Sequence, residues 1–266
     1  MYTGEQPFVG TAIYFGAIAV FLFFMGAFLV PGNVKWWFLI GGLFMVTLAW
    51  GKHFFLNDIL YDYLQMLSKF RAVTMAFGMG QLCVAVLAAL GLQQLASAEI
   101  SVERKKRALM YSAGITAVLC LFAVICFSPD GPNDAALGNN AALLKALQND
   151  RSSLMYNDLY RSLGFLAAAA ALAWLYLRGT LAASLTVLAI AALALMDHWM
   201  VTRRTLNESK YEPKRTASAI PQESPEDKQI KADPDPDYRV LDLNGGSIAT
   251  NYYPSFFHKN IGGYHA

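Results

Sequence analysis

Residues 163–200 read LGFLAAAAALAWLYLRGTLAASLTVLAIAALALMDHWM, and they decide the fold. Arg178 and Gly179 separate two apolar runs there, 163–177 and 180–200. A bilayer core about 30 Å thick needs about 20 apolar residues in a helix that rises about 1.5 Å per residue. The second run has that length. The first is shorter but rich in alanine, and small residues let membrane helices approach closely. We therefore predict two membrane-spanning helices in this stretch.

Four further apolar stretches extend the pattern, and they are residues 9–30, 36–51, 72–95 and 108–128. The composition agrees, since 56% of the 266 residues are hydrophobic and 15% are charged. Soluble domains carry roughly 45–50% apolar and about 25% charged residues. A net charge of +2 without a dense basic stripe argues against a nucleic-acid partner. The sequence predicts an all-α polytopic membrane protein with about six transmembrane helices.

The loop after the third stretch contains four consecutive basic residues at positions 104–107, which indicates the cytoplasmic side. With that loop inside, the loops 52–71 and 129–162 and both chain ends fall outside a bacterial inner membrane. The N-terminus lacks the basic region and cleavage site of a signal peptide, and the chain stops within a patterned aromatic segment. We expect a fragment of a longer protein.

Two segments of the outer loops have helical patterns. Apolar residues in 56–67 fall on one helical face, which predicts an amphipathic helix at the membrane surface. A second helix is expected over 141–161, where Asp158 and Arg161 are spaced to form an ion pair.

The tail is expected to have two parts. Residues 201–238 are polar and rich in proline toward their end, which is typical of a linker. Residues 239–266 are predicted to start an extracytoplasmic domain, and YRVLDL at 238–243 reads as a short strand.

The outer loop 52–71 holds two pairs of charged candidates. Asp58 and Asp62 lie one helical turn apart and could bind a divalent cation, but a solvated polar face is the favoured reading. Lys69 and Arg71 suit the binding of a lipid phosphate at the membrane surface, and ordinary snorkelling toward headgroups explains them equally well.

Polar residues in or beside the apolar stretches are the next candidates. Asp197 and His198 stand near the outer end of the last stretch, where capping and anchoring beside Arg203 is favoured over a functional ionisable pair. Gln81 favours a helix–helix hydrogen bond over substrate binding. In the tail, His258, Lys259, Tyr264 and His265 form a polar and aromatic cluster, which is a weak metal signal because no third ligand is in view.

Several segments together resemble one family of bacterial membrane proteins, and they follow that family's order along nearly the whole chain. They are GEQPFVGTAIYFGAIAVFLF (4–23), LAWGKHF (48–54), SKFRAVTM (68–75), NDRSSLMYNDLYRSL (149–163), MDHWMVTRRTLN (196–207), YRVLDL (238–243) and SFFHKNIGGYHA (255–266). The chain is similar in these segments to the YfhO-like family in its Bacteroidetes form. It departs from the family at the end, where Phe256 stands in a usual Ser-Tyr-Phe-His-Lys run and the chain stops at Ala266.

The resemblance implies a GT-C-like glycosyltransferase that takes a sugar from a polyprenyl-phosphate donor on the outer face, for modification of a cell-envelope glycan or glycolipid. It places the catalytic aspartate in a first outer loop upstream of this chain, so no residue here receives that role. By charge and depth, Lys69 and Arg71 are predicted to hold the donor phosphate. The alternative is a non-enzymatic transporter or scaffold for envelope lipid or polysaccharide.

Overall fold

The computed structural model describes residues 13–51, 54–63, 73–131, 134, 140–211, 222–235, 237–243 and 253–261. Regular structure in these ranges is helical apart from one isolated β-bridge. The described residues up to Leu206 belong to one compact unit, and those from Asn207 onward belong to a second.

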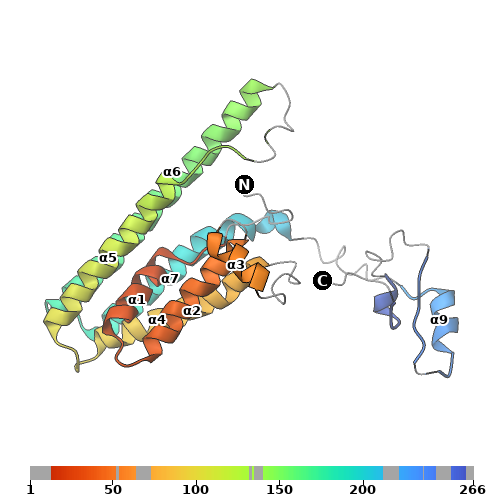
Figure 1. Cartoon of the computed structure of the whole chain (residues 1–266), viewed down its shortest axis with the longest axis horizontal. Coiled ribbons are helices and arrows are strands. Elements are labelled where there is room, and N and C mark those ends of the chain that lie inside the picture. The colour runs from red at the N-terminus through yellow and green to blue at the C-terminus, as the bar shows by residue number, and fades with distance from the viewer. Residues whose placement is uncertain are drawn as a thin grey trace. The chain divides into compact units, whose positions relative to one another are not determined.

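The first unit is a bundle of apolar helices (Figure 1). Its helices are α1 (Ala17–Leu29), α2 (Val34–Ala49), α3 (Phe55–Tyr63), α4 (Ala76–Ala96), α5 (Val102–Ile125), α6 (Ala141–Leu177) and α7 (Ala183–Thr205). Helices α4 to α7 are each long and apolar enough to cross a membrane, whereas α1 and α2 are apolar but shorter. At most 28% of each crossing stretch is buried inside the protein, so these apolar surfaces suit lipid contact. The chain therefore has the helices of a multi-pass membrane protein.

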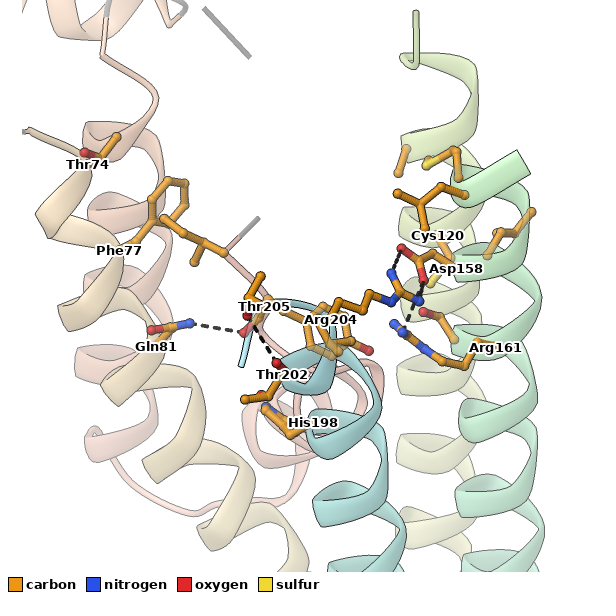
Figure 2. A pocket seen from close by; sticks show the side chains of 18 of the residues that line it. Thr74, Phe77, Gln81, Cys120, Asp158, Arg161, His198, Thr202, Arg204 and Thr205 are labelled. Atoms are coloured by element: carbon orange, nitrogen blue, oxygen red, sulfur yellow. Dashed lines mark hydrogen bonds and ion pairs between the residues drawn. The ribbon is translucent and has the colours of Figure 1, made fainter. Parts of the chain in front are cut away.

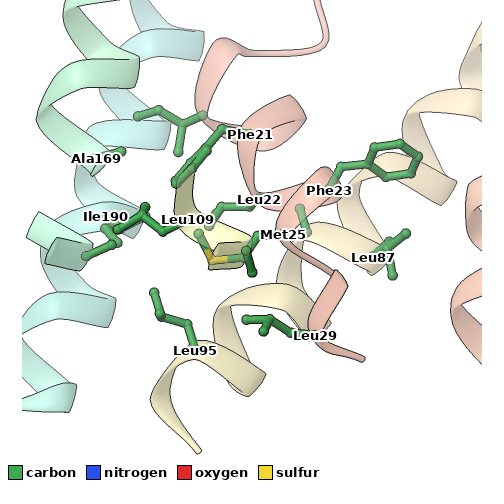
Figure 3. Close-up of a cluster of buried hydrophobic side chains, with 14 of the residues drawn as sticks. Phe21, Leu22, Phe23, Met25, Leu29, Leu87, Leu95, Leu109, Ala169 and Ile190 are labelled. Carbon is green, nitrogen blue, oxygen red and sulfur yellow. The ribbon is translucent and has the colours of Figure 1, made fainter. Parts of the chain in front are cut away.

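Helix α1 lies at the centre of the packed core (Figure 3). Ile18, Phe21, Met25 and Leu29 are fully buried and recur at three- or four-residue spacing. They pack with buried residues of α4 to α7, among them Leu87. A helix surrounded by other helices buries most of its circumference, which explains why the sequence of α1 is apolar nearly all round.

Two glycines set the close approach of α1 and α4. A methyl group at Gly26 would lie 2.3 Å from the backbone oxygen of Leu87, and one at Gly91 would lie 2.5 Å from the backbone oxygen of Leu22. No side chain fits at these distances, so the two backbones touch. Such contacts stabilise helix pairs in lipid, where apolar burial alone gives no driving force.

Helix α6 continues for 37 residues without a break. The sequence had indicated a separate outer helix over 141–161 and a membrane span over 163–177, and that division was wrong. Gly164 does not end the helix, and a methyl group there would meet no atom within 4 Å. At about 1.5 Å per residue, α6 is about 55 Å long. Its C-terminal part lies beside the antiparallel α5, and its N-terminal part extends beyond α5 (Figure 1).

The second unit contains the short helix α9 (Pro225–Lys231) and a 3-10 helix over Tyr253–Phe256. Ser224 and Asp227 form a capping box at the start of α9, so part of the predicted linker 201–238 is helical. The strand predicted over 238–243 is reduced to a single bridge between Val240 and Asn260. A strand needs a continuous partner, and among the described residues Val240 pairs only at this point.

Candidate functional site

A cavity of about 1010 Å³ opens among the helices of the first unit. It is lined by the segment before α1, the start of α4, the C-terminal parts of α5 and α7, and the middle of α6. The basic residues 104–107 stand at the other end of α5, so the cavity and this basic segment lie at opposite ends of the bundle. Apolar side chains dominate the lining, among them Ile13, Met75, Phe77, Leu154 and Leu159.

Three charged side chains meet at one wall of the cavity (Figure 2). The Arg204 guanidinium on α7 donates two hydrogen bonds to the Asp158 carboxylate on α6, at 2.7 Å to Oδ2 and 2.5 Å to Oδ1. Arg161 Nη1 lies 3.1 Å from Asp158 Oδ1. The Asp158 and Arg204 side chains are about one-third exposed, whereas that of Arg161 is 9% exposed. Asp158 thus links α6 to α7 through a fork-shaped ion pair.

Asp197, on α7, is fully buried beside this wall. Its carboxylate accepts hydrogen bonds from Tyr14 Oη, at 2.7 and 2.8 Å, and from the backbone N–H of Ala17 at 2.9 Å. Ala17 opens α1, and the preceding Gly16 has no side chain with which to cap the helix. Asp197 therefore caps α1 from another helix, where a negative charge also complements the helix dipole.

His198 packs against the turn that precedes α1. Its Nδ1 lies 3.0 Å from the backbone oxygen of Ala194, and because a carbonyl only accepts, Nδ1 carries the proton. Gly16 has φ +88°, and a methyl group there would lie 2.2 Å from His198 Cε1. Glycine at position 16 is required both by this backbone angle and by the ring of His198.

Arg161 has hydrogen-bonding capacity left over. Arg161 faces Asp158, and its Cζ lies 5.1 Å from the centre of the Tyr14 ring. Its Nε is 3.7 Å from Asp197 Oδ1. Although these carboxylates are near, Nε and Nη1 are buried and make no hydrogen bond to any residue that the structure describes. Buried polar groups are normally paired, and unpaired N–H groups on a cation can bind the oxygens of an anion in the cavity.

Several predicted residues come together at this site. Asp158 and Arg161 form the ion pair that their spacing predicted, although the Arg161 side chain is largely buried. Asp197 caps α1 rather than the end of its own helix, so this contact differs from the anchoring beside Arg203 that the sequence favoured. Gln81 also lines the cavity and donates to the backbone oxygen of Tyr14 at 3.1 Å, so it joins α4 to the segment before α1 as a polar contact between elements. Arg203 is exposed and is not among the described residues that line the cavity.

The other predicted residues are not among the described residues that line the cavity. Lys69 and Arg71 lie outside the described residues, as do Tyr264, His265 and the side chain of Asp58. Asp62 is exposed on α3. The roles predicted for Lys69 and Arg71 therefore stay predictions.

His258 and Lys259 belong to the second unit. His258 Nε2 lies 2.8 Å from Asp227 Oδ1, its Nδ1 lies 3.2 Å from Tyr238 Oη, and its ring is buried. The backbone N–H of Ser224, followed by His258, lowers the pKa of Asp227 to about 2. Lys259 Nζ lies 3.8 Å from Asp237. Both nitrogens of His258 therefore have partners, which indicates a structural role in holding this unit together.

Two residues of the site were not among the sequence candidates. Arg204 follows Asp197 by seven residues, which is two helical turns, so the helical period could have placed both on one face. Tyr14 precedes α1 and contacts a residue 183 positions later, a pairing that no local pattern reveals.

No family model, curated protein or solved structure matches the chain.

Proposed function

We propose that the cavity binds the phosphate-bearing end of a membrane lipid. We further propose that the chain belongs to a YfhO-like, GT-C-like glycosyltransferase that uses a polyprenyl-phosphate sugar. The observation that carries the proposal is Arg161, a nine-tenths buried cation whose Nε and Nη1 make no hydrogen bond to the described residues, on the wall of an apolar cavity. An amphiphile with an anionic head matches that combination of charge and lining.

The chemistry of the wall suits phosphate in particular. Guanidinium groups bind phosphate through two parallel N–H···O bonds, and Arg161 and Arg204 approach the same carboxylate from two helices. The apolar side chains of Met75, Phe77 and Leu159 would contact the first isoprene units of the lipid. A volume of about 1010 Å³ is at the upper end for small-molecule sites, typically about 300–1,000 Å³, which leaves room for a sugar head.

The membrane orientation completes the proposal. We propose that α1 and α2 cross the bacterial inner membrane together with α4 to α7, which gives six crossings. With residues 104–107 in the cytoplasm, the cavity opens on the outer side and both ends of the chain lie there. Polyprenyl-phosphate sugars would reach the cavity from that side. In the sequence, Arg71 precedes the cavity residue Thr74 by three positions, which supports keeping Lys69 and Arg71 as a second phosphate-binding pair.

In such an enzyme the arginines would act on the leaving group. When a sugar departs from its lipid phosphate, negative charge gathers on the phosphate oxygens, and cations fixed beside them lower the barrier. Asp158 receives hydrogen bonds from Arg204 and is ion-paired with Arg161. A carboxylate beside two cations is a poor base, so we assign it no role as a base. The base would be supplied by the upstream loop that the resemblance implies.

Binding of polyprenyl phosphate to the purified full-length protein in nanodiscs tests the proposal, by titration with a radiolabelled lipid. Arg204→Ala should weaken binding about tenfold or more, because a charge-assisted fork is lost. Arg203→Ala is the matched control, since it removes a neighbouring exposed arginine from the same turn. No measurable binding by the wild-type protein, or equal losses in the two variants, would contradict the assignment.

Transfer of sugar is the second readout. Membranes that contain the full-length protein should transfer a labelled sugar from a polyprenyl-phosphate donor, and Lys69→Ala combined with Arg71→Ala should abolish donor binding while leaving insertion intact. Lipid binding without transfer would support the alternative, a lipid transporter or scaffold.

A further inference from the structure

We infer that Asp158 is an internal competitor of the ligand: its carboxylate occupies the position between Arg204 and Arg161 that the ligand phosphate takes. This inference rests on the proposed function and specifies how its site selects a ligand. A carboxylate and a phosphate present the same paired oxygens to a guanidinium, so one can replace the other.

The geometry places Asp158 in a ligand-like position. Both of its oxygens accept from the fork of Arg204, at 2.7 and 2.5 Å, and its Oδ1 is also 3.1 Å from Arg161 Nη1. Yet Arg161 Nη1 and Nε make no hydrogen bond to the described residues, so Asp158 neutralises Arg161 without satisfying it. A phosphate has a third terminal oxygen and a tetrahedral shape, and could reach both guanidinium groups at once.

The formal charges at the wall show which carboxylate a phosphate would displace. Asp158 and Asp197 balance Arg161 and Arg204, so the wall is formally neutral before a ligand arrives. A phosphate added to this wall meets two carboxylates as well as two guanidinium groups. Asp197 is held by Tyr14 and the Ala17 N–H and is fully buried, whereas the Asp158 side chain is one-third exposed. Asp158 is therefore the carboxylate that can leave.

Ligand entry would then open the link between α6 and α7. Asp158 on α6 and Arg204 on α7 hold each other across the cavity wall (Figure 2). When the phosphate takes over Arg204, Asp158 turns toward solvent and the two helices lose this connection. A neutral lipid cannot displace a carboxylate from a guanidinium, so the exchange selects phosphorylated lipids over uncharged ones.

Asp158→Asn tests the inference, because asparagine keeps the shape of the side chain and removes the competing charge. Binding is measured on the full-length protein in nanodiscs with three probes: polyprenyl phosphate, the uncharged polyprenol, and inorganic phosphate. We expect Asp158→Asn to bind polyprenyl phosphate about ten- to a hundredfold more tightly than the wild type, the range associated with a charge-assisted hydrogen bond. Polyprenol binding should not change. If Asp158→Asn also binds inorganic phosphate more tightly to the same degree, the exchange needs only the phosphate. If it binds only the lipid more tightly, the apolar lining is also needed.

Two controls accompany the variant. Asp150→Asn removes an exposed aspartate from the same helix and should leave all three affinities unchanged. In an Arg204→Ala background, Asp158→Asn should tighten lipid binding much less, because the guanidinium for which the two anions compete is gone. Monodisperse elution and unchanged helix content by circular dichroism are required of each variant.

The outcomes separate the two proposals. If the wild type binds polyprenyl phosphate and Asp158→Asn binds equally or more weakly, Asp158 positions the arginines and the competitor inference is wrong, while the proposed function stands. If Asp158→Asn tightens polyprenol equally, the substitution merely opens the cavity, and the inference is again wrong. If neither protein binds the phosphorylated lipid, the proposed function itself fails.

Discussion

Asp197 Oδ2 accepts the backbone N–H of Ala17 at 2.9 Å, so a side chain within α7 caps the first turn of α1, 180 residues earlier in the chain. The same carboxylate accepts from Tyr14 and neighbours Arg161. One buried charge thus joins α1, α6 and α7 at the cavity.

Replacing Asp197 should destabilise the bundle strongly. Asp197→Ala leaves the Tyr14 hydroxyl and the Ala17 N–H without their acceptor, and it leaves buried Arg161 beside fewer negative charges. Breaking such a buried network costs about 3–5 kcal/mol. Asp197→Asn should cost less, because its amide oxygen can still accept from Ala17. Unfolding in mixed detergent micelles measures both, and equal stability of Asp197→Ala and wild type would disprove the capping role.

The α1–α4 contact should not tolerate a methyl group. Gly91→Ala would place Cβ 2.5 Å from the Leu22 oxygen and 2.6 Å from the Gly26 nitrogen, both backbone atoms that cannot rotate away. We expect a loss of about 1–3 kcal/mol, the usual cost of overpacking. Gly114→Ala and Gly164→Ala are matched controls, since a methyl group there meets no atom within 4 Å and alanine favours a helix. If either control variant were also destabilised, the loss of stability in Gly91→Ala would not be due to the α1–α4 contact.

The second unit should lose stability at low pH. The pKa of Asp227 is lowered to about 2, chiefly by the backbone N–H of Ser224 and further by His258 and Tyr253. The folded pKa lies below the ordinary carboxyl value of about 3.9, so this contribution is complete above about pH 4 and is lost as the pH falls toward 2. Hydrogen exchange of α9, corrected for its intrinsic pH dependence, should rise over this range. Asp227→Asn should show fast exchange already at neutral pH, whereas Glu226→Gln, an exposed neighbour, should match the wild type.

The orientation of the bundle is open to chemical labelling. In a variant lacking the three native cysteines, Lys106→Cys should resist an impermeant thiol reagent added to intact cells. Asn140→Cys, at the start of α6, should react. Lys106 lies near the start of α5 and Asn140 follows the loop after its other end, so the two positions report opposite faces of the membrane. Reaction at Lys106→Cys alone would invert the orientation and place the cavity on the cytoplasmic side.

Local sequence patterns predicted much of the helical fold. They failed where contacts between segments distant in the sequence determine the structure. Apolar runs gave the positions of α4, α5 and α7, since the stretch of each helix that can cross the membrane is apolar. They missed the charged first turns of α5, where residues 104–107 belong to the helix and not to a loop. The break expected before 163 was wrong, because polar residues such as Arg151 and Asp158 interrupt the apolar pattern without interrupting the helix. Asp134 pairs with Arg151 across 17 residues, a contact set by how the loop folds back.

The site was anticipated only in pieces. Spacing along one helix indicated the Asp158–Arg161 pair. The position of Asp197 near the end of an apolar stretch favoured capping and anchoring beside Arg203, and not the cap of α1 that the structure shows. The partner of Asp158 on α7 and the partners of Asp197 before α1 depend on helix packing, which a single sequence does not encode locally. The unsatisfied N–H groups of Arg161 become visible only when these neighbours are in place.

The length of α6 has a mechanical consequence. The helix is about 55 Å long and a bilayer core is about 30 Å thick, so part of α6 extends beyond the hydrocarbon core. In this part of α6, Arg151 donates hydrogen bonds to the Pro129 oxygen and the Asp134 carboxylate and so holds the preceding loop. Asp158 follows Arg151 by seven residues in the same unbroken helix. Because the helix has no break between Arg151 and Asp158, a movement of its N-terminal part would reach the Asp158–Arg204 pair without a hinge to absorb it.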